Sequence, residues 1–171
     1  MLLLEKNAKE DIDFRRYRTA LHVEGIGYMA FGIWSVIKVV MSVFLGELAF
    51  STVIDVSGFA EEEIIFAQIA YAVVIFVIML VVLIVHCYIG ISAIKFSRGK
   101  KKSKVFLVVA GVLILMNIMG LPSYRDTVER VGMQNIDTVI ASAIADITVI
   151  LLLINLIYSA VRLSKMSHKM V

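Results

Sequence analysis

The sequence predicts an all-α, polytopic membrane protein, built as a bundle of four transmembrane helices. Two observations support this fold class. Hydrophobic residues make up 60% of the 171 residues, whereas an ordinary soluble domain has about 45–50%, so the excess has to face lipid. The apolar residues also gather into four long stretches that few charged residues interrupt.

The expected spans are residues 20–46, 64–94, 105–124 and 138–161. The second holds 31 residues without Lys, Arg, Asp or Glu, which as a helix would be about 46 Å long and exceeds the roughly 30 Å of a hydrocarbon core. The third is just long enough to cross and is followed by Arg125. The first and fourth each contain charged residues, yet they still match the pattern of membrane spans.

The remaining segments form one membrane domain, 1–171, together with these spans. Residues 1–19 place apolar and charged side chains on different faces of a helix, which predicts a short N-terminal interfacial helix. It would serve as a membrane anchor or as a docking site for another protein. The connecting segments are an outer loop at 47–63, a basic loop at 95–104, a second outer loop at 125–137 and a tail at 162–171.

The distribution of Lys and Arg predicts the orientation. The segments 1–19, 95–104 and 162–171 carry 14 of the 17 basic residues, and the two outer loops carry two basic residues beside eight acidic ones. Because basic flanks are retained in the cytoplasm, we expect a cell-membrane protein with both termini cytoplasmic. Contact with anionic lipid headgroups explains the basic loop sufficiently, so we expect no nucleic-acid partner.

Two segments that leave the second and fourth spans resemble each other. Residues 92–98 (SAIKFSR) and 159–165 (SAVRLSK) match in class at all seven positions and are identical at three. Two explanations stay open. The chain consists of two parallel-repeat helical hairpins, or helices that leave the cytoplasmic face tend to end in small, aliphatic and basic residues.

Ionisable residues inside the spans are candidates for function, since burying charge in a membrane is costly. Lys38 and Asp146 both lie about 12 Å below the outer ends of their spans at ~1.5 Å per residue, so we predict that they pair, with either a structural or a functional role. Glu24 and His86 share a level near the cytoplasmic side. They would relay protons, or Glu24 would reach cytoplasmic water while His86 bonds a neighbouring helix.

Small residues predict where helices approach closely. They are Gly25, Gly27 and Gly32 on the first span, and Ala141 and Ala145 on the fourth. Small side chains let helix backbones come together in a membrane. We therefore expect the first and fourth spans to touch.

The motifs of membrane enzymes are absent from the sequence. The three histidines are far apart, and no H-E-x-x-H or C-x-x-C spacing occurs. The one cysteine, Cys87, adjoins His86, but adjacent residues on a helix point about 100° apart and do not form a Cys–His dyad. We expect no enzymatic activity, no cofactor and no metal site.

Two functions fit these residues. The first is a homo-oligomeric channel or a transporter of small solutes or ions, with Lys38, Asp146, Glu24 and His86 near the path. The second is an accessory or scaffold subunit that binds another membrane protein through its small-residue faces or its N-terminal helix. The intramembrane charges favour the first.

Overall fold

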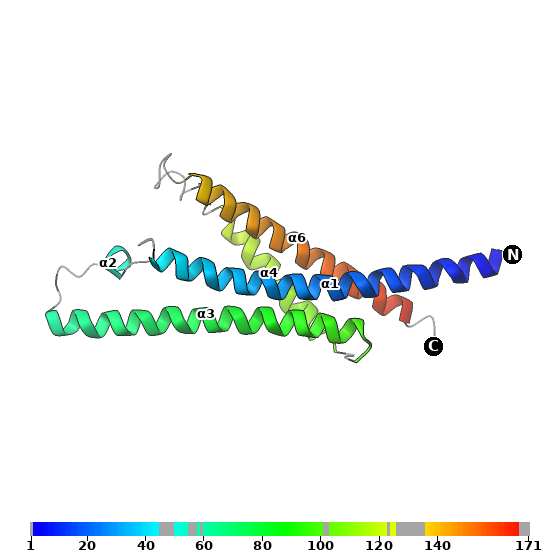
Figure 1. The fold of residues 1–171 in the computed structure, drawn as a ribbon, viewed down its shortest axis with the longest axis horizontal. Helices are drawn as coiled ribbons and strands as arrows, with labels where there is room; N and C mark the ends of the chain where they lie inside the picture. The colour runs from blue at the N-terminus through cyan, green and yellow to red at the C-terminus, as the bar shows by residue number, and fades with distance from the viewer. Residues whose placement is uncertain are drawn as a thin grey trace. The chain divides into compact units, whose positions relative to one another are not determined.

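The protein is all-helical throughout the part that the structure describes. This computed structural model describes the backbone of residues 2–44, 50–54, 58, 60–100, 103–122, 124–125 and 136–167, with all of their side chains except those of 2–9, 51–52 and 137–138. The helices are α1 (Leu2–Phe44), α2 (Phe50–Val53), α3 (Glu61–Ser97), α4 (Val105–Gly120) and α6 (Ile136–Ser167), as labelled in Figure 1. Residues 47–49, 55–57 and 59 of the first predicted outer loop and 126–135 of the second lie outside these residues.

Three helices are long and apolar enough to cross a membrane. They are Glu10–Phe44 within α1, all of α3, and Val139–Ser167 within α6. The fourth apolar helix, α4, has only 16 residues, or about 24 Å. The prediction of helices in the four apolar stretches is therefore confirmed, and three of them reach the length of a span.

The helix α4 ends earlier than the expected span 105–124. It stops at Gly120, and turn hydrogen bonds follow from the Leu121 amide to the Ile118 carbonyl (3.2 Å) and from the Tyr124 amide to the Leu121 carbonyl (3.2 Å). Pro122 explains the early end, because proline lacks the backbone N–H that would continue the helix, although Leu121 before it still has helical φ and ψ of −58° and −40°.

The helix α1 is continuous, whereas the sequence analysis expects an interfacial helix over 1–19 before the first span. The structure has one helix from Leu2 to Phe44, 43 residues long. No Pro or Gly precedes Gly25, and Arg15 bonds Asp11 one turn away at 3.1 Å, so nothing in this stretch breaks the helix. The location of 1–19 on a membrane surface stays a prediction.

The start of α3 is stabilised by acidic residues. The backbone N–H of Ala60 donates to Oε2 of Glu63 at 3.0 Å, which is half of a capping box. Glu61, Glu62 and Glu63 occupy the first turn, where negative charge interacts favourably with the helix dipole. These three glutamates therefore have a structural role at the helix end.

The end of α3 is a Schellman motif. The Lys100 amide donates to the Lys95 carbonyl (2.9 Å) and the Gly99 amide to the Phe96 carbonyl (3.0 Å). Gly99 has φ = 71°, a left-handed conformation that costs other residues free energy. This glycine turns the chain from α3 toward α4.

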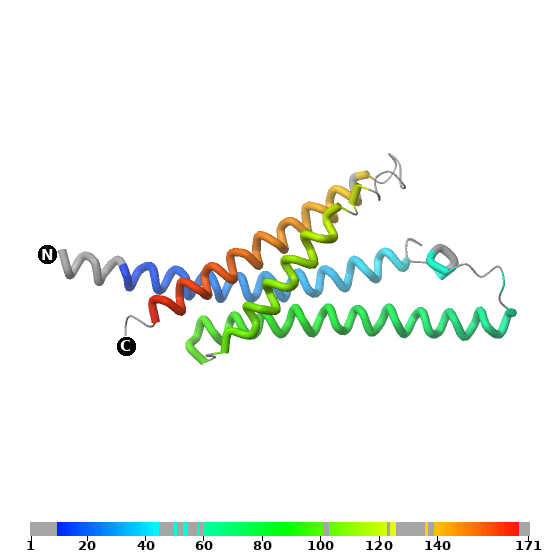
Figure 2. Tube along the Cα trace, turned by 180° about the vertical axis from the view of Figure 1, so that it is seen from behind, coloured from blue at the N-terminus to red at the C-terminus, as the bar shows by residue number. Residues whose placement is uncertain are grey.

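The chain forms two compact units. Unit 1 contains Met1–Met29 and Tyr88–Val171, and unit 2 contains Ala30–Cys87. In unit 1, α4 and α6 lie side by side, as Figures 1 and 2 both show. Side chains from all four long helices are fully buried in its core: Leu21 and Tyr28 of α1, Ile89 and Ala93 of α3, Phe106 and Ala110 of α4, and Leu153, Leu156 and Ala160 of α6.

Unit 2 consists of the second part of α1, α2 and the first part of α3. A Cβ placed on Gly32 would lie 2.5 Å from Cβ of His86, so the backbone of α1 comes very close to that side chain. The rings of Phe50 and Tyr71 meet edge to face with their centroids 5.9 Å apart. Many large apolar side chains of this unit are exposed, among them Trp34 and Phe66, and such a surface suits contact with lipid.

Candidate functional site

Glu24 is an acidic side chain at the edge of the core of unit 1. Its Oε1 atom accepts a hydrogen bond from Oγ of Ser159 on α6 at 3.3 Å. Its Oε2 atom is enclosed and has no hydrogen-bond partner among the residues that the structure describes. A buried polar atom without a partner is uncommon in native proteins and calls for an explanation.

Apolar side chains of the same helix help to enclose Glu24. Leu21 and Tyr28, one turn before and one turn after it, are 0% and 1% exposed. Residues at these spacings share one face of a helix. The carboxyl group therefore lies on the face of α1 that packs into the core.

Close helix packing fixes the rotation of α1 at this level. A Cβ on Gly25 would lie 2.9 Å from the carbonyl oxygen of Gly90 and 3.3 Å from Cβ of Ala93, both on α3. A Cβ on Gly27 would lie 3.2 Å from Cδ1 of Leu152 on α6. The two glycines let α1 pack against α3 on one side and α6 on the other, with Glu24 beside Gly25.

The two similar segments of the sequence both reach this region. Ser92, Ala93, Ser159 and Ala160 are all buried. From α3, Ala93 lies against Gly25, and from α6, Ser159 bonds Glu24. The Ser–Ala pair that begins both segments thus packs in the core of unit 1. This role is compatible with both explanations, a repeat of helical hairpins and a general similarity of helix ends.

Ser159 is a contact residue that the sequence analysis does not predict. The identity of Ser92 and Ser159 is the sequence signal that could have indicated this contact, because identical polar residues at matched helix positions favour a shared environment. Which of the two serines bonds an acidic partner depends on the orientation of each helix about its own axis, and only the structure gives that orientation.

His86, the predicted partner of Glu24, bonds its own helix. Its Nδ1 atom donates to the carbonyl oxygen of Val82 at 2.8 Å, and its Cβ atom faces Gly32. His86 belongs to unit 2 and Glu24 to unit 1. Their pairing stays a prediction.

Asp146 has a partner that the sequence analysis does not predict, since Tyr124 donates a hydrogen bond from its hydroxyl to Oδ2 of Asp146. Both residues belong to unit 1, whereas Lys38 belongs to unit 2. The Lys38–Asp146 pair stays a prediction, now with a neutral donor already present at Asp146. The sequence signal for the Tyr124 contact is its position at the end of the apolar stretch before α6. A residue at the end of one helix lies near the next helix when the two are antiparallel.

The alanines predicted to provide close packing on α6 have a different environment. Ala141 is exposed and Ala145 is partly exposed. The contact of α1 with α6 in unit 1 instead involves Gly27 with Leu152 and Glu24 with Ser159. Gly27 of α1 thus packs against a large side chain of α6, while Gly25 packs against α3.

The described residues include no group of three or more His, Cys, Asp or Glu side chains that could hold a metal ion. No family model, curated protein or solved structure matches the chain. A functional proposal therefore depends on the geometry around Glu24.

Proposed function

We propose that this chain is an integral protein of the cell membrane, with both termini cytoplasmic, that assembles as a homo-oligomeric channel or transporter of small cations. The observation that carries the proposal is the Glu24 carboxyl group, which has one oxygen bonded to Ser159 and the other enclosed without a partner. A carboxylate at membrane depth is costly to retain and marks an ion or substrate pathway by default.

A cation is the ligand that fits this group. One oxygen of Glu24 keeps its acceptor capacity unused, and a carboxylate oxygen accepts hydrogen bonds or coordinates hard cations. The Ser159 hydroxyl oxygen, 3.3 Å from Oε1 of Glu24, also has acceptor capacity and would add a second oxygen.

The filled core of unit 1 favours an oligomer. Tyr28, Leu153 and Leu156 are fully buried there, and a packed helical core leaves no aqueous path through it. A path that includes Glu24 would run along the surface of unit 1, where a second copy of the chain completes it. Lys38, Asp146 and His86 would lie near that path.

An accessory or scaffold role is the alternative. Its proposed contact surface included the small residues of α1, but Gly25 and Gly27 already pack against α3 and α6 of the same chain, and Gly32 packs against His86. This packing leaves the N-terminal part of α1 and the exposed Ala141 on α6 as surfaces for such a partner, and the enclosed charge of Glu24 favours the transport proposal.

The test is cation flux into liposomes that contain the purified protein. We expect a defined homo-oligomer in detergent, and flux that falls at least about tenfold in Glu24→Gln. Glutamine keeps an acceptor for Ser159 but removes the charge. The matched control is Glu62→Gln, an exposed glutamate in the first turn of α3, which should keep most of the flux.

Two results would overturn the proposal. A purified oligomer that passes no cation excludes transport. A monomer that co-purifies with another membrane protein supports the accessory role instead.

A further inference from the structure

Two tyrosines and an arginine form a cluster where α1 meets the last turns of α6. The rings of Tyr17 and Tyr158 meet edge to face, with their centroids 5.9 Å apart. The Nε atom of Arg162 donates to the Tyr158 hydroxyl at 3.1 Å, and its guanidinium carbon lies 5.4 Å from the centre of that ring. All three residues belong to unit 1, and we call them, together with Arg16, the α1–α6 cluster.

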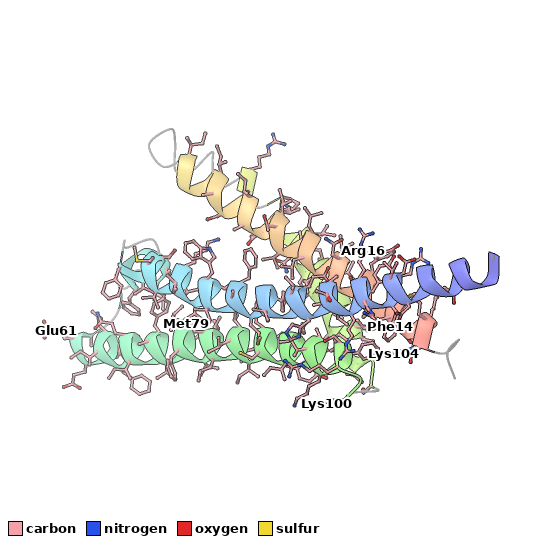
Figure 3. All side chains as sticks on the ribbon, turned by 45° about the vertical axis from the view of Figure 1, so that its right-hand side comes forward. Phe14, Arg16, Glu61, Met79, Lys100 and Lys104 are labelled. Atoms are coloured by element: carbon pink, nitrogen blue, oxygen red, sulfur yellow. The ribbon has the colours of Figure 1, made fainter. Side chains whose placement is uncertain are left out.

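The cluster is positively charged and exposed. Arg16 directly precedes Tyr17 on α1, and both Arg16 and Arg162 are exposed; Figure 3 labels Arg16 on α1. Asp13 lies one helical turn before Tyr17, so two positive charges of the cluster have one negative residue nearby in the sequence of α1. The bond to Tyr158 occupies one of five N–H donors on Arg162, and a guanidinium matches a phosphate with two parallel hydrogen bonds.

The height of the cluster matches the edge of a membrane. Tyr17 lies three residues before the expected start of the first span at 20, and Tyr158 lies three residues before the expected end of the fourth at 161. Their ring contact brings these two helix ends to one level. Tyrosine is enriched at that level, with its hydroxyl toward the headgroups and its ring toward the hydrocarbon.

Exposed aliphatic side chains lie within about three helical turns of the cluster along the same two helices, on its membrane side. On α1 these are Val23 and Ile26, and on α6 Ile154 is likewise exposed. Acyl chains would pack on such side chains while the phosphate stayed at the level of the arginines. A positive headgroup site above an apolar surface is the arrangement that a phospholipid requires.

We propose that the α1–α6 cluster is a binding site for the phosphate of an anionic phospholipid in the cytoplasmic leaflet. Arg162 holds the phosphate with its outer guanidinium nitrogens, Arg16 supplies the second positive charge, and the Tyr158 hydroxyl holds Arg162 in place. The site is separate from the basic loop 95–104. It depends on the membrane location in the proposed function but not on transport.

The test measures binding of phosphatidylglycerol to the purified full-length protein by native mass spectrometry, with phosphatidylcholine as the zwitterionic reference. We expect the protein to retain phosphatidylglycerol preferentially, and Arg162→Gln to weaken this retention about tenfold, since charge-assisted hydrogen bonds are lost. Arg162→Lys keeps the charge without the paired donors, and it should give an intermediate loss. Glycerol phosphate, which offers the same phosphate without acyl chains, should not compete at equal concentration.

The matched control is Arg125→Gln, an exposed basic residue in the expected outer loop after α4, which should keep the preference. Helix content and elution volume show whether each variant is folded, and Arg16→Gln tests the site if Arg162→Gln does not fold. Equal losses in Arg125→Gln and Arg162→Gln would show a general charge effect and overturn the site. Competition by glycerol phosphate would show a soluble-anion site instead.

These outcomes are distinguishable from a failure of the proposed function. Retention of phosphatidylglycerol by a protein that passes no cations would reject transport and keep the site. Retention of both lipids without preference would reject the site alone. Failure to retain any lipid would reject the membrane location and with it both proposals.

Discussion

The Tyr124 hydroxyl donates a hydrogen bond to the Asp146 carboxylate, which joins the chain just after α4 to the middle of α6. This bond supplies a partner for an acidic side chain within a candidate span. It links two residues that lie before and after 126–135, the segment that the structure does not describe. The α4–α6 pair is therefore held together by a polar contact as well as by apolar packing.

Replacing Tyr124 by Phe should destabilise the protein. The change removes a hydrogen bond to a charged group, worth about 1.5–3 kcal/mol. Unfolding of the purified protein in mixed micelles of increasing denaturing detergent measures the difference. In an Asp146→Asn background the same change should cost less, about 1 kcal/mol, and equal costs in both backgrounds would show that the two residues are not coupled.

Exchanging the charges of Lys38 and Asp146 tests their predicted pairing. The single variants Lys38→Asp and Asp146→Lys should each lose assembly, because each leaves two like charges at one depth. The double variant should restore it. Elution volume on size-exclusion chromatography measures assembly, and a double variant no better than either single one would contradict direct pairing.

Adding a methyl group at Gly25 should separate α1 from α3. The new Cβ would lie 2.9 Å from the Gly90 carbonyl oxygen, so the backbones must move apart at a cost of about 1–3 kcal/mol. Gly111→Ala is the matched control, since a Cβ there meets nothing within 4 Å and alanine favours the helix by about 1 kcal/mol. From most to least stable, the order should be Gly111→Ala, wild type and Gly25→Ala. If Gly111→Ala destabilised the protein as much as Gly25→Ala, the close approach of α1 and α3 at Gly25 would be contradicted.

The turn after α3 should depend on Gly99. Its φ of 71° costs an alanine about 1–2 kcal/mol. Asparagine tolerates this conformation better, so Gly99→Asn should lose less stability than Gly99→Ala. Unfolding midpoints of the two variants provide the measurement, and identical midpoints would show that the left-handed geometry is not required.

The helices were largely predictable from the sequence because long apolar stretches decide them locally. The span predicted at 64–94 lies within α3, which runs from Glu61 to Ser97. The two differences also have local causes. Pro122 ends the fourth helix early, and a run without Gly or Pro lets α1 continue from Leu2 through the predicted boundary at residue 19.

The contacts of the candidate site were less predictable. Glu24 was identified because a charge in an apolar stretch is costly, but its bond to Ser159 depends on the rotation of two helices about their axes. The packing of Gly25 on Gly90 decides that rotation, and Gly90 gives no sign in the sequence of which helix it faces. The bond of Tyr124 to Asp146 was not predicted for a related reason. When only depth in the membrane is compared, the charge of Lys38 makes it the stronger candidate partner for Asp146.

The matching Ser–Ala pairs of α3 and α6 have an evolutionary consequence. If one ancestral hairpin was duplicated, both copies began with the same Ser–Ala pair on their second helix, which became α3 in one copy and α6 in the other. In the present protein Ala93 lies against Gly25, while Ser159 bonds Glu24. The alanine of one pair and the serine of the other would then have taken on different contacts with α1, so a mutation in one pair would not be compensated by the other.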